Sequence, residues 1–151
     1  MERVLALDVG ERRIGVAVSD ALGVTAQGVT VIHRQTLSRD LEAVLELVDR
    51  YAARLVVVGL PLNMNGSKGP QAEVAEQFGE ALAAAGQVQI VYQDERLSTA
   101  AAERTLLLAD VSRRKRKDVI DMLAAQLILE TYLGRRQQSS PGLSSDPSGK
   151  Y

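Results

Sequence analysis

Acidic side chains stand in three separate segments where they could do chemistry. In the first segment, Asp8 lies inside an apolar run, between Leu7 and Val9. A carboxylate buried in such a run is costly unless it is paired with a cation or bound to a metal. Asp8 is therefore either a hydrogen-bonded or ion-paired group of the interior or a metal ligand, and its position alone favours neither.

The second segment, Asp94 and Glu95, follows an apolar run that ends at Tyr92. Successive residues of an extended chain point to opposite sides. Only one of these two carboxylates can then face the same pocket as Asp8. The alternative interpretation is a solvated acidic turn with Arg96 as its counter-ion, which is a common surface arrangement.

The third segment holds Asp118 and Asp121, which are spaced so that they share one face of a helix. Asp121 lies in an otherwise apolar stretch over residues 119–125. Asp118 also fits the ordinary preference of acids for a helix N-terminus. Two like charges one turn apart repel each other, and a divalent cation would convert that repulsion into binding.

Carboxylates that converge from three segments would form an all-oxygen site. Such a site selects hard cations, here Mg²⁺ or Mn²⁺. Cations held by carboxylates can activate water and stabilise both the attacking and the leaving oxygens when a phosphodiester is hydrolysed. The composition suits this chemistry, because the 151 residues include no cysteine and only one histidine, His33. Thiolate nucleophiles, zinc–thiolate sites and iron–sulfur clusters are thereby excluded.

An unbroken basic run stands directly before the third acidic segment and consists of Arg113, Arg114, Lys115, Arg116 and Lys117. A solvated basic loop is the common explanation of such a run, but its position beside the acids favours contact with a phosphate backbone. The net charge is −1, so nucleic-acid binding would depend on this local patch. Further cations that could extend it are Arg12, Arg13, Lys68, Arg96 and Arg104.

Recognition of nucleic acid should depend on backbone and shape. Aromatic residues make up only 3% of the chain, which leaves few side chains for stacking on unpaired bases. The segment 61–69 carries Asn63, Asn65, Ser67 and Lys68 and follows a short apolar run. This segment is either a substrate-contacting loop or simply a long connection from a strand to a helix.

The spacing of apolar residues predicts strands over 3–9, 14–18, 28–33, 55–58 and 88–92. It predicts helices over 37–52, 70–85 and 117–133, and a further helix capped by Ser98 or Thr99 that runs to about residue 108. A strand meander followed by β-α-β units forms a mixed sheet with helices on its faces, an α/β fold. Ligands of such sheets bind beyond the carboxyl ends of the parallel strands.

Residues 1–134 are expected to form one domain, and residues 135–151, rich in Ser, Gly and Pro, a disordered tail. No apolar stretch reaches the roughly 18 residues of a membrane span. The first residues lack the pattern of a secretory signal, so the expected location is the cytoplasm.

Four motifs, in order between residues 3 and 134, resemble the YqgF/RuvX family. They read Leu5-Ala6-Leu7-Asp8-Val9-Gly10 with Ile14-Gly15-Val16-Ala17, then Val58-Gly59-Leu60-Pro61-Leu62-Asn63, then Asp94-Glu95-Arg96-Leu97-Ser98-Thr99, and finally Ile120-Asp121-Met122-Leu123-Ala124-Ala125. The resemblance implies a ribonuclease H-like fold, with a central mixed five-stranded sheet in the order 3-2-1-4-5, and a metal-dependent nuclease. By motif position the family's acids fall on Asp8, Glu95 and Asp121, and Asp118 is a further candidate ligand.

That strand order separates Glu95 from Asp8. The segment 94–96 follows the fifth strand, which lies two places and roughly 10 Å from the first. The chain must bend back for Glu95 to share a metal with Asp8. Ribonuclease H-like enzymes usually take their second acid from the end of the fourth strand, where this chain reads Gly59-Leu60-Pro61.

The preferred hypothesis is a phosphodiesterase that processes the 5′ end of pre-16S rRNA, the usual assignment in this family. Asp8, Glu95 and Asp121, with Asp118 as a possible helper, hold one or two cations. Water attacks the scissile phosphate and leaves a 5′-phosphate and a 3′-hydroxyl. The nucleic acid would contact Arg96, Asn63, Lys68 and the basic run.

Three alternatives stay open. The first is a Holliday junction resolvase acting on four-way DNA, for which a homodimer would suit a symmetric junction. The second is a non-catalytic RNA- or ribosome-binding module that keeps its acids for metal-stabilised folding. The third is an ATP-binding domain of the sugar-kinase type. The length of one domain disfavours the third, because such proteins need two lobes.

Overall fold

A mixed five-stranded sheet forms the centre of the molecule. The computed structural model describes residues 3–95 and 113–139, the side chains of 113–117 and 137–139 excepted. The strands are β1 (Arg3–Val9), β2 (Arg13–Ser19), β3 (Ala26–His33), β4 (Ala53–Leu60) and β5 (Gln89–Asp94). They are ordered β3-β2-β1-β4-β5, with antiparallel pairs β1–β2 and β2–β3 and parallel pairs β1–β4 and β4–β5. The predicted sheet and strand order are confirmed.

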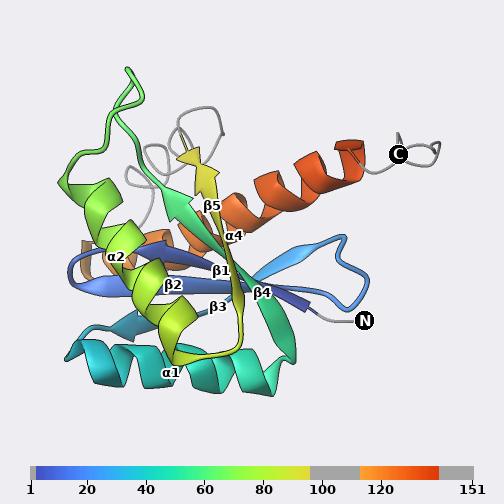
Figure 1. The fold of residues 1–151 in the computed structure, drawn as a ribbon, viewed down its shortest axis with the longest axis horizontal. Coiled ribbons are helices and arrows are strands. Elements are labelled where there is room, and N and C mark those ends of the chain that lie inside the picture. The colour runs from blue at the N-terminus through green and yellow to red at the C-terminus, as the bar shows by residue number, and fades with distance from the viewer. Residues whose placement is uncertain (1–2, 96–112, 140–151) are drawn as a thin grey trace.

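Helices cover both faces of this sheet. Helices α1 (Leu37–Arg50) and α2 (Pro70–Ala85) pack on one face, and α4 (Arg113–Ser139) crosses the other (Figure 1). The side chains of β1 alternate between two buried clusters: Leu5 and Leu7 belong to the α1–α2 side, whereas Val4 and Ala6 belong to the α4 side. Residues two apart in a strand point to the same side of the sheet. Asp8 therefore points to the same side as Ala6, which is the face that α4 covers.

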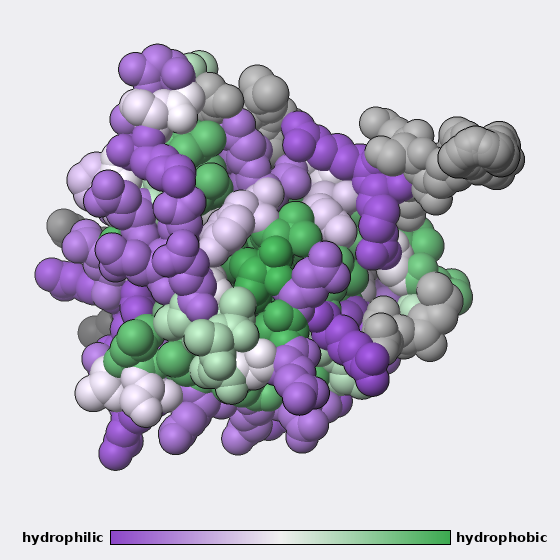
Figure 2. Space-filling model, viewed as in Figure 1, coloured by the Kyte–Doolittle hydropathy of each residue, from purple (hydrophilic) through white to green (hydrophobic). Residues whose placement is uncertain are grey.

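The ends of α1 and α2 follow local chemistry. The side-chain oxygen of Thr36 accepts a hydrogen bond from the main-chain N of Arg39 at 3.2 Å and caps α1. Helix α1 stops two residues before the predicted end, because Ala52 adopts a positive φ of 53°. Helix α2 begins at Pro70 and ends before Gly86, as predicted. The outer face of these two helices is mostly hydrophilic (Figure 2).

Helix α4 is longer than predicted at both ends. It begins at Arg113, so the basic run forms its first turns rather than a loop. It ends at Ser139, so residues 135–139, predicted as the start of a disordered tail, are helical. The prediction followed the apolar stripe, which covers only the middle of the helix. Beyond the stripe, long polar residues continue the helix because their helix propensity is high. The helix predicted to begin at Ser98 or Thr99 and the rest of the predicted tail lie outside the described residues. No helix in the described part of the chain combines the length and apolarity needed to cross a membrane.

Gly15 allows α4 to lie directly on β2. A Cβ built at Gly15 would overlap the main-chain carbonyl group of Asp121. We expect Gly15→Ala to lower the free energy of unfolding by about 3 kcal/mol, because two backbone segments must separate to admit one methyl group. Urea unfolding followed by circular dichroism measures this change.

Gly134→Ala is the matched control for that experiment. Gly134 also belongs to α4, and a Cβ there would meet nothing within 4 Å. This variant should be more stable than the parent by roughly 0.5–1 kcal/mol, because alanine loses less backbone entropy in a helix. Equal unfolding midpoints for Gly15→Ala and the parent would contradict the close packing of α4 on β2.

Candidate functional site

A cavity of about 340 Å³ lies at the carboxyl end of β1. Its charged lining residues are Asp8, Glu11, Arg12, Arg13 and Asp121, and Pro61 and Gln71 line it from the segment between β4 and α2 and from α2 itself. The cavity therefore joins β1, the β1–β2 turn, β2 and α4. It lies where ligands of sheets with parallel strands usually bind.

The packing of α4 brings Asp121 to Asp8. Asp8 is the Cα partner of Gly15 across the β1–β2 pair. Gly15 in turn touches the main chain of Asp121. Both carboxylates line the same cavity although they are more than 100 positions apart in the sequence. The structure thus brings together two of the three acids that the family resemblance placed in the site.

Asp121 is held by an arginine. Nε of Arg13 donates to Oδ2 of Asp121 at 2.6 Å, and the two side chains are 23% and 20% exposed. A hydrogen bond between two charged groups at this distance is a strong one. Sequence reasoning placed Arg13 only in a diffuse basic patch and missed this pair. The pair could have been suspected from the spacing of Arg13 and Gly15, because residues two apart in a strand lie on the same face of β2.

Asp118 points to a different partner. Its Oδ2 lies 3.1 Å from Nε2 of His33, and the two side chains are 50% and 66% exposed, with Asp118 the less exposed. His33 ends β3, two strands from β1, and Asp118 does not line the cavity. The two acids of this helix turn therefore have separate partners. We consequently favour Asp121 over Asp118 as a candidate ligand.

Glu95 reaches back over β4. Its side chain is buried, and Oε2 lies 2.8 Å from the position that a Cβ of Gly59 would take. The same position lies 2.5 Å from Cδ1 of Ile128, a residue of α4, so the carboxylate stands on the α4 face of the sheet. Gly59 follows Val58, the β4 partner of Leu7, so it lies beside the end of β1. The missing side chain of Gly59 thus gives Glu95 its route toward the strand that carries Asp8.

Glu95 nevertheless stays outside the cavity that Asp8 and Asp121 share. Within residues 3–95 and 113–139, no three acidic or histidine side chains are grouped closely enough to hold a metal ion. Asp8 and Asp121, which both line this cavity, do fit a small hard cation, because Mg²⁺ commonly binds through one or two carboxylates and keeps several waters. The donor set therefore suits such an ion with Asp8 and Asp121 as its protein ligands.

One buried donor lies on the same side of the sheet. Gln93 is the Cα partner of Gly59, and its buried Nε2 has no hydrogen-bond partner among residues 3–95 and 113–139. Buried polar groups of this kind are rare and are often found where a ligand or water binds. Sequence reasoning missed this donor, because Gln93 looks like an ordinary residue near the end of a strand.

Of the residues predicted to contact nucleic acid, the structure describes the side chains of Lys68 and Asn63. Nζ of Lys68 lies 2.6 Å from Oε2 of Glu76, and this hydrogen bond raises the pKa of Lys68. Asn63 donates to Oγ of Ser67 at 2.9 Å, so it shapes its own loop. Arg96 and the side chains of the basic run at 113–117 lie outside the described residues.

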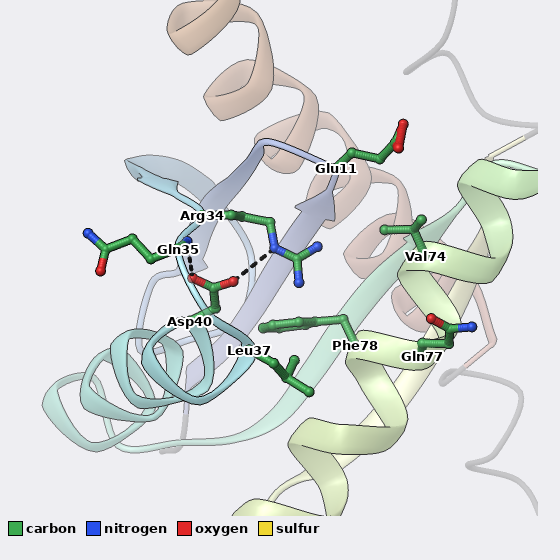
Figure 3. Close-up of a pocket in the computed structure, with 8 residues that line it drawn as sticks. All are labelled: Glu11, Arg34, Gln35, Leu37, Asp40, Val74, Gln77 and Phe78. Carbon is green, nitrogen blue, oxygen red and sulfur yellow. Dashed lines mark hydrogen bonds and ion pairs between the residues drawn. The ribbon is translucent and has the colours of Figure 1, made fainter.

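A second network braces the β1–β2 turn from the other side, and Figure 3 shows its pair of Arg34 and Asp40. Nε of Arg34 donates to Oδ2 of Asp40 at 3.0 Å, and its Nη1 donates to the carbonyl oxygen of Gly10 at 3.0 Å. The guanidinium also lies 5.2 Å from the ring centroid of Phe78. The turn that follows Asp8 is thereby tied to α1 and α2. A separate cavity of about 450 Å³ lies among these residues.

Comparison with known proteins finds relatives of similar sequence and solved structures of similar fold. Proteins of Carboxydothermus hydrogenoformans and Moorella thermoacetica, both named "Putative pre-16S rRNA nuclease", are 50% and 54% identical to this chain over 137 residues, which is 91% of this chain and 99% and 98% of theirs. The fold resembles that of Thermus thermophilus RuvC solved with a Holliday junction substrate, with a TM-score of 0.57 at 16% identity over 91% of this chain and 96% of RuvC. It also resembles the fowlpox virus Holliday junction resolvase, with a TM-score of 0.50 at 14% identity over 88% of this chain and 99% of that one.

At these low identities the solved structures show the fold alone, and it is the ribonuclease H-like fold that the resemblance implied. The family itself is shown by a sequence model. The model described as "RuvX: Holliday junction resolvase" matches residues 2–135. The predicted family is confirmed, and this chain belongs to the RuvX family.

Proposed function

We propose that this protein is a divalent-cation-dependent nuclease that hydrolyses phosphodiester bonds near the 5′ end of pre-16S rRNA. The observation that carries the proposal is the convergence of Asp8 and Asp121 in one cavity at the carboxyl end of β1. The choice of substrate is supported by relatives at 50% and 54% identity, whose names describe them as pre-16S rRNA nucleases.

Each acid has a defined part in this proposal. Asp8 and Asp121 supply oxygen ligands from β1 and α4, and Glu95, buried over Gly59, is the third acid available on that face. A bound divalent cation, Mg²⁺ or Mn²⁺, supplies water activation and neutralises negative charge on the phosphate. Hydrolysis adds the hydroxyl of water to phosphorus and transfers its other proton to the departing 3′ oxygen. The products are a 5′-phosphate and a 3′-hydroxyl.

The nucleic-acid contacts of the proposal extend from this cavity. The basic run at 113–117 forms the first turns of α4 and precedes Asp118 and Asp121 on the same helix. Cations at that helix end would bind backbone phosphates on either side of the scissile bond. Arg96, Asn63 and Lys68 are proposed to add contacts from the segments that follow β5 and β4.

A Holliday junction resolvase is the second candidate. It is favoured by the description of the family model. A symmetric homodimer would then place two cavities on two symmetry-related strands of a four-way junction. The two candidates use the same acids and differ only in the nucleic acid that reaches them.

A cleavage panel distinguishes these candidates. The purified protein is incubated with a precursor rRNA fragment that spans the mature 5′ end, with single-stranded RNA of the same length, and with four-way DNA, each in Mg²⁺, Mn²⁺ or EDTA. We expect cation-dependent cutting of the precursor fragment at one position. Faster cutting of four-way DNA would favour the resolvase. Cutting of no substrate, together with a cation-dependent rise in melting temperature, would replace the nuclease by a non-catalytic binding module.

A further inference from the structure

Arg13 is anchored at one of its three side-chain nitrogens. Nε donates to Oδ2 of Asp121 at 2.6 Å. In the described part of the chain, Nη1 and Nη2 of Arg13 have no protein hydrogen-bond partner. The side chain is 23% exposed and lines the same cavity as Asp8 and Asp121. The two terminal amino groups are therefore accessible from a cavity that holds both proposed cation ligands.

The anchor also fixes the direction of these amino groups. A guanidinium is planar, and its donors form a rigid fork. Once Nε is held by Asp121, the other donors have little freedom to turn away. A phosphodiester presents two non-bridging oxygens, which match a guanidinium fork in geometry and in charge. Arg12 lines the cavity too, but only its main-chain carbonyl makes a hydrogen bond within the described residues, with the N of Arg34.

The charges of the cavity support an anionic occupant beside a cation. Among the residues that the structure describes, three carboxylates and two guanidinium groups line it, a formal charge of −1. One divalent cation and one phosphodiester anion together bring that charge to zero. A cation alone would leave the cavity positive, and the phosphate removes the excess.

From these observations we infer that Arg13 binds the scissile phosphate through Nη1 and Nη2 while Nε remains on Asp121. Arg13 is then a catalytic residue of the site, since it touches the group that reacts. This inference rests on the proposed function, because it takes the cavity of Asp8 and Asp121 as the place of cleavage.

The test uses binding rather than cleavage. An oligonucleotide of the preferred substrate is prepared in a series, each member with one methylphosphonate linkage, which removes one non-bridging oxygen and the negative charge. Nucleosides next to the altered linkage carry 2′-O-methyl groups so that the linkage is stable. Dissociation constants are measured by fluorescence anisotropy in Ca²⁺ for the parent protein, Arg13→Gln, Arg13→Lys and Arg50→Gln. Arg50 is an exposed residue of α1 paired with Glu46 and serves as the matched control for loss of one positive charge.

We expect one linkage at which the methylphosphonate weakens binding of the parent and of Arg50→Gln by roughly tenfold, the size of one bidentate charged contact. At that linkage Arg13→Gln should lose most of this difference between the modified and unmodified oligonucleotides. Arg13→Lys, which keeps the charge but loses the fork, should retain only part of the difference. Melting temperatures of the variants establish that they are folded under the conditions of the assay.

An unchanged sensitivity profile in Arg13→Gln would overturn the inference, and so would a scan in which no linkage matters to the parent. Failure of the proposed function is distinguishable, because it would appear as absence of cleavage in Mg²⁺ and Mn²⁺ whatever the binding scan shows. If cleavage occurs at a linkage other than the one sensed by Arg13, Arg13 does not hold the scissile phosphate and the inference is wrong.

Discussion

Asp8→Asn is expected to lower the rate of phosphodiester cleavage by roughly 1000-fold, a loss of about 4 kcal/mol of transition-state stabilisation. The substitution keeps the size and nearly the shape of the side chain and removes the charge that a divalent cation requires. Asp8 lines the cavity together with Asp121 and is the only acidic residue of β1, so no other residue of that strand can replace its charge. Affinity for the nucleic acid should stay within about twofold, because most of that affinity comes from backbone contacts outside the cavity.

Single-turnover rates with protein in excess measure the effect on chemistry, and anisotropy measures the affinity. Asp49→Asn is the matched control, since Asp49 is an exposed acid of α1 and the charge change is the same. It should cleave at the parental rate. Equal rates for Asp8→Asn and Asp49→Asn would remove Asp8 from the site.

Gly59→Ala is the second variant with a large expected effect, a roughly 100-fold slower cleavage. The new Cβ would stand 2.8 Å from Oε2 of Glu95 and 2.5 Å from Cδ1 of Ile128. Both neighbours are buried and both distances are too short for a real Cβ contact, so the methyl group can be admitted only if both of them move. Displacement of its carboxylate moves Glu95 away from Gly59 and therefore away from the end of β1, which carries Asp8.

A double-mutant cycle with Glu95→Gln separates this effect from a general loss of packing. If Gly59→Ala acts by moving Glu95, the double variant should be about as slow as the slower single variant. Rates that multiply in the double variant would mean that the methyl group acts on something other than Glu95. Gly134→Ala, with open space around its Cβ, is the control and should cleave normally.

The sheet could be predicted from the sequence because its signals are local. Apolar runs, the turn after Gly10 and the proline at the start of α2 mark their elements one by one, and the resemblance supplied the strand order. The ends of α4 could not be predicted in the same way. The basic residues before Asp118 and the polar residues after Gly134 carry no apolar stripe, and only propensity extends the helix through them.

The acids of the candidate site could be predicted from the sequence, whereas their contacts could not. Asp8 and Asp121 were identifiable because each is an acid among apolar residues. The ion pair of Arg13 with Asp121 was not, because it depends on how closely α4 approaches β2 at Gly15. The position of Glu95 depends in the same way on Gly59. A glycine inside a strand can mark such a close approach, but the sequence does not say which segment approaches.

We propose that Asp8 and Asp121 together hold a divalent cation. Crystals of the protein soaked in Mn²⁺ and measured at the manganese edge test it most directly, with Asp121→Asn crystals as the control. We expect an anomalous peak between the two carboxylates, roughly 2.0–2.6 Å from an oxygen of each, and its loss in the control. A parental crystal with no peak in this cavity, or one with manganese bound only elsewhere, would show that Asp8 and Asp121 do not form the cation site.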